Sequence, residues 1–177
     1  MKIVFICVNY NNSKHTLKYI KSILKFKNKC FFKIIVVDNA SKKNDIKQLE
    51  KVNFSEVNII KSKKNVGYFK GLNIGINTVK SFDFDYVVIG NNDLTFDKNF
   101  IKELTNSRYD KSIFVIAPNI IKPDGSHQNP HIKNKFNFFI RTYRKLYYSN
   151  YYVSIILQYI MNLKKRFTKS YDRLGHD

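Results

Sequence analysis

The stretch VVIGNNDLTF, Val87–Phe96, begins as a short apolar run and breaks off in Asn91, Asn92 and Asp93 before apolar residues resume. Two interpretations of this polar triplet are open. Asn and Asp are common in turns, where their side chains bond to nearby backbone groups. In open parallel sheets, however, ligands bind beside the carboxyl ends of the strands. The other strand ends of the chain are needed to choose between a turn and a binding site.

Short apolar runs rich in β-branched residues predict buried strands. They are Ile3–Val8, Phe31–Val37, Val57–Ile60, Tyr86–Ile89 and Ile113–Ala117. Apolar residues at helical spacing predict helices between them. These helices contain Leu17–Leu24, with Ser13 as the N-cap, then Ile46–Val52, Phe69–Val79 and Phe100–Leu104. Because strands alternate with helices, the sequence predicts an α/β fold with a mostly parallel sheet flanked by helices.

Three of the predicted strands end in polar clusters: Asn9–Asn12, Asp38–Ser41 and Asn91–Asp93. In a parallel sheet the carboxyl ends of neighbouring strands lie at the same edge, so these clusters are expected to meet. Unrelated turns would not need their carboxylates at one edge. The pattern therefore favours a binding site over a simple turn after residue 90.

The chain has 177 residues, of which 44% are hydrophobic, a composition that supports a buried core and excludes general disorder. Its net charge of +19 favours anionic partners such as phosphorylated metabolites, nucleic acid or an acidic membrane surface. Cys7 and Cys30 have no metal-binding spacing, and both are expected to be reduced. The apolar N-terminal run enters a polar cluster at once, which favours a strand over a signal peptide.

The residue types at the strand ends suggest their chemistry. Asp93 could bind Mg²⁺ or Mn²⁺, which prefer oxygen ligands and often share them with substrate phosphates. Asp38 could accept a hydrogen bond from a base or a sugar hydroxyl. Lys63, Lys64 and Lys70 could offset phosphate charge, although exposed lysines are usually only solvated. No Walker or Rossmann glycine motif is present in the segment Asn65–Gly75.

Four ordered motifs resemble the family 2 glycosyltransferases, which have a GT-A (Rossmann-like) fold. The motifs are VNYNN at 8–12, VVDNAS at 36–41, NVGYFKGLNIGI at 65–76 and DYVVIGNND at 85–93. Each motif alone is weak, but four in order form a specific signal. The resemblance extends over about two thirds of the chain, from Met1 to Gly125.

The resemblance implies a site residue by residue. The residues it implies for nucleotide binding are Val8, Asn9, Tyr10, Asn11, Asp38, Asn39, Asn65, Gly67, Asn73 and Asn92. It further implies that Asp93, with Asn91, binds a divalent metal that bridges the diphosphate. Only Asp93 of this triplet has a charge, so a modest metal affinity is expected. The implied substrate is a nucleotide-diphosphate sugar, and the implied acceptor is a polysaccharide, glycolipid or other cell-envelope molecule.

One part of the family pattern is missing. Inverting members need a carboxylate base well after the metal motif, and a sugar hydroxyl needs such a base on physical grounds. After Gly125 the only acidic residues are Asp172 and Asp177, and neither lies in an acidic pair. The catalytic base is therefore unassigned. Two functions remain open: an active transferase, and a truncated or partner-dependent domain that binds the nucleotide sugar without transferring it. A nucleic-acid-binding module is disfavoured because no strand has an RNP-like signature.

The predicted nucleotide-sugar-binding domain covers residues 1–130, and residues 131–177 form a basic, aromatic tail with a predicted helix at Val153–Leu163. The tail could pack on the sheet or on a partner. It could also lie on an acidic membrane, with aromatic residues at the interface and Lys164–Arg166 near the headgroups. The expected location is the cytoplasm, with peripheral contact at the inner face of the membrane as an alternative.

Overall fold

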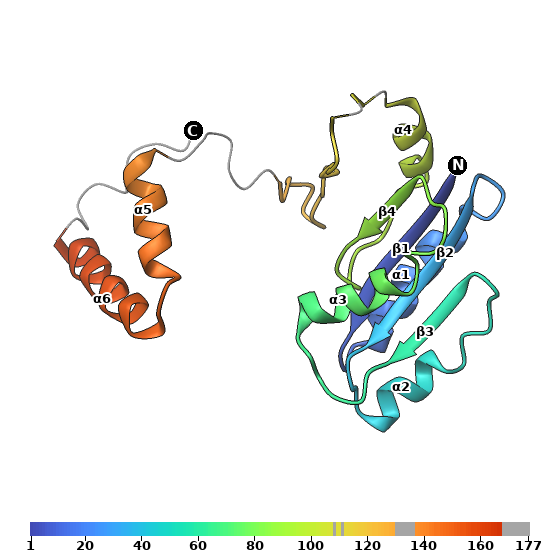
Figure 1. Cartoon of the computed structure of the whole chain (residues 1–177), viewed down its shortest axis with the longest axis horizontal. Coiled ribbons are helices and arrows are strands. Elements are labelled where there is room, and N and C mark those ends of the chain that lie inside the picture. The colour runs from blue at the N-terminus through green and yellow to red at the C-terminus, as the bar shows by residue number, and fades with distance from the viewer. Residues whose placement is uncertain (108, 111, 130–136, 168–177) are drawn as a thin grey trace. The chain divides into compact units, whose positions relative to one another are not determined.

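The computed structural model describes residues 1–107, 109–110, 112–129 and 137–167 (Figure 1). The chain divides into two units, Met1–Lys111 and Ser112–Asp177, and each is described by itself. The predicted domain boundary after residue 130 falls outside the described residues. Within the described ranges, no helix has the length and apolar character that crossing a bilayer requires.

The first unit is built on a four-stranded sheet in which every neighbouring pair is parallel (Figure 1). The strands are β1 (Lys2–Asn9), β2 (Phe31–Asp38), β3 (Val57–Lys61) and β4 (Tyr86–Ile89), and their order in the sheet is β3-β2-β1-β4. The predicted α/β fold with a mostly parallel sheet is confirmed. Because all four strands point the same way, their carboxyl ends lie along one edge.

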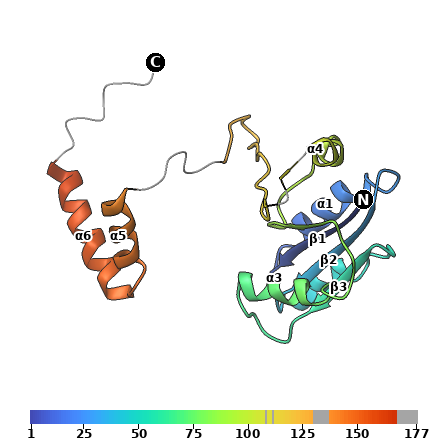
Figure 2. The ribbon, with the colours of Figure 1, turned by 45° about the horizontal axis from the view of Figure 1, so that its top comes forward.

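Helices cover both faces of this sheet (Figure 2). One face packs against α1 (Ser13–Leu24), α2 (Lys43–Leu49) and α4 (Phe100–Asn106). The opposite face packs against α3 (Tyr68–Asn77). Covering both faces explains why β1 and β2 are continuous apolar runs. Along β1, Ile3, Phe5 and Cys7 enter the first core cluster, while Val4, Ile6 and Val8 enter the second.

Helix α3 lies very close to β1 because glycines form its contact surface. A Cβ on Gly75 would lie 2.5 Å from Ile6 Cγ2, and one on Gly71 would lie 3.0 Å from Val8 Cγ2. Any larger residue at position 75 would push the helix off the sheet. These glycines therefore serve helix packing, which agrees with the absence of a phosphate-loop motif in the sequence.

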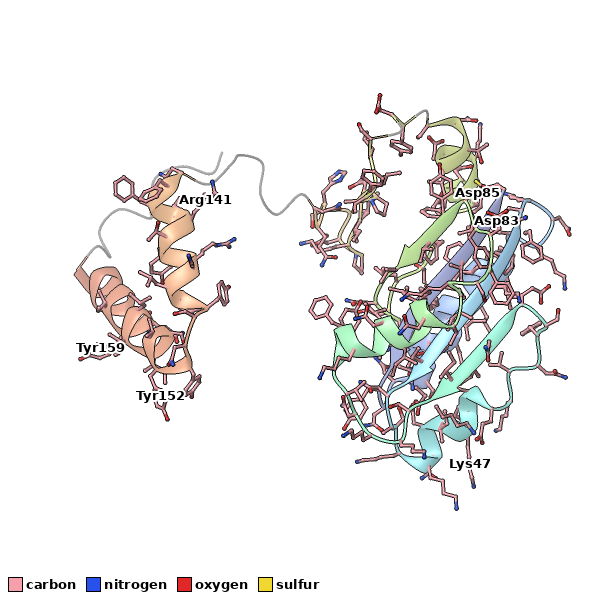
Figure 3. The ribbon with its side chains drawn as sticks, viewed as in Figure 1. Lys47, Asp83, Asp85, Arg141, Tyr152 and Tyr159 are labelled. Carbon is pink, nitrogen blue, oxygen red and sulfur yellow. The ribbon has the colours of Figure 1, made fainter. Side chains whose placement is uncertain are left out.

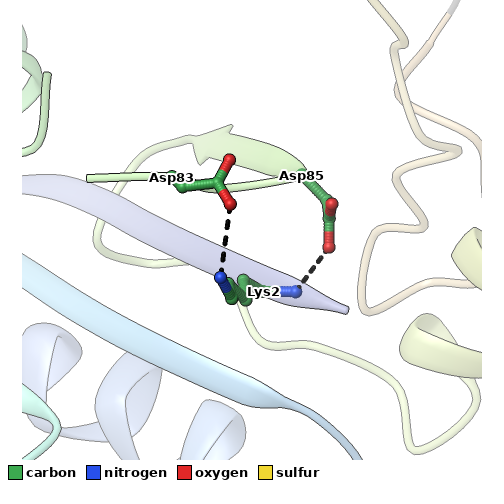
Figure 4. A network of polar contacts seen from close by, with 3 residues as sticks. All are labelled: Lys2, Asp83 and Asp85. Atoms are coloured by element: carbon green, nitrogen blue, oxygen red, sulfur yellow. Dashed lines mark hydrogen bonds and ion pairs between the residues drawn. The ribbon is translucent and has the colours of Figure 1, made fainter. Parts of the chain in front are cut away.

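At the amino edge of the sheet, Lys2 forms hydrogen bonds with Asp83 and Asp85 (Figure 4). Its backbone N–H donates to Asp85 Oδ2 at 2.7 Å, and its Nζ donates to Asp83 Oδ2 at 3.3 Å. Asp85 N–H in turn donates to Lys2 O at 2.9 Å. These contacts join the start of β1 to the residues before β4. They lie at the edge opposite to the polar clusters.

The second unit contains two packed helices, α5 (Phe138–Tyr147) and α6 (Tyr151–Phe167). Asn137 caps α5, since its Oδ1 accepts from Ile140 N–H at 2.9 Å. The predicted helix Val153–Leu163 lies within α6. In Figure 3, Tyr159 projects from α6 on the side away from α5. The other large apolar side chains exposed on the pair include Phe138, Phe139, Tyr151, Tyr152 and Ile156.

Two local predictions are wrong. Ile113–Ala117 is no strand, and the only bridge in the described part of its unit pairs Ile121 with His127. Phe114 is 92% exposed, and without a partner strand a β-branched composition cannot form a ladder. Ser13 is not the N-cap of α1 but its first residue, because Asn12 occupies the cap position. Neither side chain caps the helix there; Ser13 instead donates its backbone N–H to Asp45 Oδ1 at 2.9 Å.

Candidate functional site

The carboxyl edge of the sheet brings together three of the four motifs directly. Asn9 ends β1, Asp38 ends β2, and the two are paired in the parallel register. The Asn91–Asp93 triplet follows β4 on the other side of β1. The fourth motif, Asn65–Gly67, precedes α3 and is bonded to the loop after β2. The edge therefore contains polar side chains from four separate segments of the chain.

Asn9 is fully buried, and its side-chain amide joins three segments. Its Nδ2 lies 2.9 Å from Asp38 Oδ1, 2.9 Å from Asp45 Oδ2 and 3.0 Å from Ser41 Oγ. Two carboxylates can only accept, so the amide nitrogen must face them. On its other side, Asn9 Oδ1 accepts from Thr16 Oγ1 at 2.7 Å. Both polar atoms of the Asn9 side chain are thus hydrogen-bonded within the protein itself.

Asn39 plays the same part for the loop before α3. Asn39 is buried. Its Nδ2 donates to Asn65 Oδ1 at 2.8 Å, and its Oδ1 accepts from Val66 N–H at 2.9 Å. Asn65 Oδ1 also accepts from Gly67 N–H at 2.9 Å. Gly67 has a φ of 85°, a backbone conformation that favours glycine, and it precedes the first residue of α3. Asn39 therefore fixes where α3 begins.

The triplet after β4 is divided between the interior and the surface. Asn91 and Asp93 are exposed, whereas Asn92 is half-buried. Asn92 Nδ2 donates to Thr16 Oγ1 at 2.8 Å. Asp93 makes no hydrogen bond or ion pair within the described residues, but it lies close enough to Tyr68 for its charge to affect the pKa of the Tyr68 hydroxyl. Burial first, and then the charges of Cys7 and Asp93, raise the pKa of the Tyr68 hydroxyl.

The remaining predicted residues surround this edge. Tyr10 is half exposed and Asn73 is exposed on α3, while Val8 is buried against Gly71. Asn11 has a φ of 52° and accepts from Lys42 N–H through Oδ1 at 2.8 Å. Lys63, Lys64 and Lys70 are all exposed. This end of the sheet thus presents both an aromatic ring and exposed lysines to solvent.

Sequence reasoning missed Thr16 and Asp45. Thr16 is fully buried and has the spacing of the apolar positions Tyr19, Ile20 and Ile23 on α1. A polar residue on the apolar face of a helix was the available signal. Burial acts to raise the pKa of Asp45, but hydrogen bonds from Asn9, Ser13 and Ser41 outweigh it, so the pKa lies below its usual value. Asp45 is therefore a half-buried anion that its neighbours stabilise.

A shallow hollow of about 380 Å³ lies beside this edge rather than within it. It is lined by Ser13, Lys14, Leu17, Lys18, Lys21 and Gln48. None of the residues predicted for the site lines it. Its lysines have the character of a solvated basic helix face.

Comparison with known proteins agrees with the four motifs. The family model described as glycosyl transferase family 2 matches residues 4–166. The chain belongs to this family. None of the curated proteins matches the chain.

Solved structures agree with the family assignment at the level of the fold. The crystal structures of S. aureus TarS 1-349 with UDP and with UDP-GlcNAc each have a TM-score of 0.50 and 23% identity to this family 2 chain. Each alignment covers 59% of this chain, and 31% and 30% of the respective TarS chain. The family 2 chain therefore spans less than a third of the length of these structures. The predicted GT-A-like fold is confirmed.

The family implies a divalent metal, and the donor atoms at the edge fit one. Asp93 offers a carboxylate and Asn91 an amide oxygen, both exposed, and such hard oxygen ligands suit Mg²⁺ and Mn²⁺. Among the described residues no three His, Cys, Asp or Glu side chains come together as a metal site. A metal at Asp93 would therefore need further ligands from a diphosphate and water.

Proposed function

We propose that this chain binds a nucleotide-diphosphate sugar at the carboxyl edge of its sheet, for transfer of the sugar to a polysaccharide, glycolipid or other cell-envelope acceptor. The observation that supports this best is that some polar residues of the edge are buried and bonded to the protein while others are exposed. Asn9, Asp38 and Asn39 are buried and paired, while Asp93 and Asn91 are exposed beside them. A rigid buried layer under exposed ligand groups is what a preorganised binding site requires.

The base of the nucleotide is assigned to the ends of β1 and β2. Asp38 Oδ1 accepts a hydrogen bond from Asn9 Nδ2 and Asp38 Oδ2 accepts one from Ser41 N–H, which leaves further lone pairs for a base N–H. The half-exposed ring of Tyr10 is available to stack on the base. Val8, Asn11 and Asn73 complete the walls in this proposal. Because one of the TarS crystal structures is a complex with UDP, UDP is the first nucleotide to test.

The diphosphate is assigned to the space between Asp93 and the start of α3. This helix has ten residues, begins after Gly67 and has no side-chain cap, so its first N–H groups are available to an anion. Asp93 and Asn91 would hold a divalent ion, which would stabilise the charge developing on the departing diphosphate. The exposed cations Lys63, Lys64 and Lys70 add favourable charge near this end of the sheet.

The acceptor hydroxyl still needs a base. Asp38 and Asp45 already accept hydrogen bonds from the protein, and Asp93 is assigned to the metal. Asp172 and Asp177 lie outside the described residues. This favours, as a second candidate, a domain that binds the donor but needs a partner or a further segment for transfer. Binding and turnover therefore have to be measured separately.

The deciding experiment is titration calorimetry of UDP, GDP and dTDP into the 177-residue chain, with and without Mn²⁺. We expect Mn²⁺-dependent binding of at least one nucleotide. Asp93→Ala should abolish the Mn²⁺-dependent part. Asp83→Ala is the matched control, since it removes an exposed carboxylate at the opposite edge of the sheet. Binding of none of the three nucleotides would overturn the proposal.

Turnover is measured with a nucleotide sugar that contains the base found to bind. The readout is release of the nucleoside diphosphate in the presence of candidate glycan and lipid-linked acceptors. Release that depends on acceptor supports an active transferase. Tight donor binding without release under any condition supports the binding-only candidate. Either result leaves the donor site itself established by the calorimetry.

We also propose that α5 and α6 contact an acidic membrane surface. The exposed aromatic side chains of the pair, together with Arg141 and Lys145, have the composition of an interfacial helix. Co-sedimentation with vesicles containing phosphatidylglycerol, but not with pure phosphatidylcholine, is the expected result. A Tyr152→Ser and Tyr159→Ser double variant should reduce it. Unchanged co-sedimentation of this variant would contradict the proposal that the exposed aromatic side chains of α5 and α6 make the membrane contact.

A further inference from the structure

A continuous chain of side-chain hydrogen bonds runs beneath the carboxyl edge. Asn92 Nδ2 donates to Thr16 Oγ1 at 2.8 Å, Thr16 Oγ1 donates to Asn9 Oδ1 at 2.7 Å, and Asn9 Nδ2 donates to Asp38 Oδ1 at 2.9 Å. We call these four residues the relay. It joins the loop after β4 to the end of β2, across β1 and the first turns of α1. Its central members, Thr16 and Asn9, are completely buried.

The direction of every bond in the relay is determined by chemistry. Asp38 can only accept, so Asn9 must present its nitrogen to it and its oxygen to Thr16. The single hydroxyl hydrogen of Thr16 is then given to Asn9, and its lone pairs remain for Asn92. Only a residue that both donates and accepts fits position 16. A buried threonine that donates to Asn9 and accepts from Asn92 thus links the end of β1 to the loop after β4.

The two ends of the relay are not equally secured. Asn9 keeps contacts to Asp38, Asp45 and Ser41 whatever happens at Thr16. Asn92 has only longer alternatives, at 3.4 Å to Asn12 O and 3.5 Å to Asn9 Oδ1. Loss of the Thr16 hydroxyl would therefore release Asn92 and leave Asn9 largely in place. The Thr16 hydroxyl is therefore the partner in the shortest hydrogen bond of the Asn92 side chain.

We propose that Thr16 is a positioning residue that fixes the exposed ligand groups Asn91 and Asp93 relative to the base-binding Asp38. This assignment rests on the proposed function, in which Asp93 and Asp38 contact opposite ends of the nucleoside diphosphate. Asn92 is turned inward by Thr16, and the alternation of the loop then directs its two neighbours to solvent. In this proposal Thr16 contacts neither the nucleotide nor the metal. It sets the geometry that allows one nucleotide to reach both Asp38 and Asp93.

The test compares Thr16→Val with wild type in UDP binding with and without Mn²⁺. Valine has nearly the same shape but no hydroxyl, and Thr16→Ser restores the hydroxyl. We expect Thr16→Val to lower the UDP affinity about tenfold in Mn²⁺, which is ~1.4 kcal/mol, and by less than about twofold without metal. Thr16→Ser should recover most of the loss. Thr105→Val is the matched control, because the Thr105 hydroxyl donates to Ile101 O within its own helix, at 2.8 Å.

A merely structural role for Thr16 would give a different pattern. The UDP affinity would then fall equally with and without Mn²⁺, or the unfolding midpoint would fall with both affinities unchanged; either result overturns the proposal. Should the valine variant fail to fold, Asn92→Ala cuts the same bond from the loop side. It is expected to lose the same Mn²⁺-dependent part of the affinity, and retention of that part would overturn the proposal.

A ligand-free measurement separates this inference from the proposed function. Leu94 N–H donates to Asn91 O, at 3.5 Å, and reports on the closure of the loop. Its amide hydrogen exchange should be about tenfold faster in Thr16→Val than in wild type, with the β1 amides unchanged. Failure of wild type to bind any nucleotide, with this exchange effect present, would overturn the proposed function but leave Thr16 as the residue that fixes the loop. Unchanged exchange at Leu94 overturns the inference itself.

Discussion

The loops after β1 and β2 differ sharply from the loop after β4, although all three are rich in amides and carboxylates and lie at one edge. Asn9, Asp38 and Asn39 are almost completely buried and bonded to each other's loops. Asn91 and Asp93 are exposed, and Asp93 makes no hydrogen bond within the described residues. We call the first group the paired layer and the second group the open pair. Similar residue types thus serve two purposes, and burial decides which.

The difference has a physical origin. A buried amide or carboxylate without a partner costs about 1–3 kcal/mol, so every buried polar atom of the edge has to be bonded within the protein. A bonded atom has less capacity left for a ligand, and of the paired layer only Asp38 is proposed to use its remaining lone pairs for one. Exposed groups have no such requirement and remain available. The paired layer should therefore be the main contributor to stability, and the open pair should control the metal-dependent part of binding.

The largest expected effect comes from Asn9→Ala in the paired layer. It would leave the buried Asp38 and Thr16, and the half-buried Asp45, each without one partner, which should lower the free energy of unfolding by about 3 kcal/mol. Urea unfolding followed by circular dichroism measures this. Asn73→Ala removes the same side chain from an exposed position and should change stability by less than about 0.5 kcal/mol. Equal effects of the two variants would contradict the division into two groups.

A smaller effect is expected for Asp45→Asn, and it should depend on pH. Losing the charge-assisted bonds from Asn9 and Ser13 should cost about 2 kcal/mol near pH 6. Because the folded pKa of Asp45 is lowered, its charge stabilises the fold above the unfolded pKa of about 3.9. This contribution disappears as the pH falls through the lower folded pKa.

Urea unfolding of wild type and Asp45→Asn at several pH values checks this expectation. The stability difference between the two proteins should narrow as the pH falls below about 4, since protonated Asp45 is also neutral. Glu50→Gln provides the control, because Glu50 forms only an exposed ion pair with Lys61. A stability difference that is constant down to pH 2 would show that the charge of Asp45 is unimportant.

Tyr19→Phe tests the cost of a buried polar group by removing one that has no partner in the described part of the chain. Tyr19 is fully buried on α1, and its hydroxyl has no hydrogen-bond partner among the described residues. Removing it should leave stability unchanged or raise it by up to about 1 kcal/mol, while the edge-to-face contact with Phe96 is kept. Thermal unfolding of the variant measures the difference. A clear loss of stability would mean that this hydroxyl is bonded, for instance to a buried water.

Much of the sheet could be predicted from sequence, because burial on both faces imposes a continuous apolar run. Tyr86–Ile89 was predicted with its observed bounds, and Phe31–Val37 lacked only Asp38 of β2. The run Ile113–Ala117 has the same composition but no ladder, since pairing depends on a neighbouring strand that composition does not report. Composition therefore predicts the capacity to form a strand, and the fold decides whether it forms.

The motifs indicated residues that the fold brings to one edge of the sheet, but not which of them bond to the protein itself. The motifs indicated Asn9, Asn39 and Asn92 together with Asp93, yet the three amides bond to the protein. Thr16 and Asp45 lie outside every motif, and only the fold brings them to the end of β1. Which amides are covered depends on the packing of α1 and α2 over the edge, which is a tertiary property.

The smallest effect on stability is expected for Asp93→Ala, and it gives the clearest contrast with Asn9→Ala. Because Asp93 is exposed and makes no hydrogen bond or ion pair within the described residues, its removal should change the free energy of unfolding by less than about 0.5 kcal/mol. The same variant should lose the Mn²⁺-dependent part of nucleotide binding. Parallel urea unfolding and calorimetry on one preparation would show a variant that is stable but cannot bind. If Asp93→Ala lost stability and binding together, Asp93 would belong to the paired layer, and the metal would have to be assigned elsewhere.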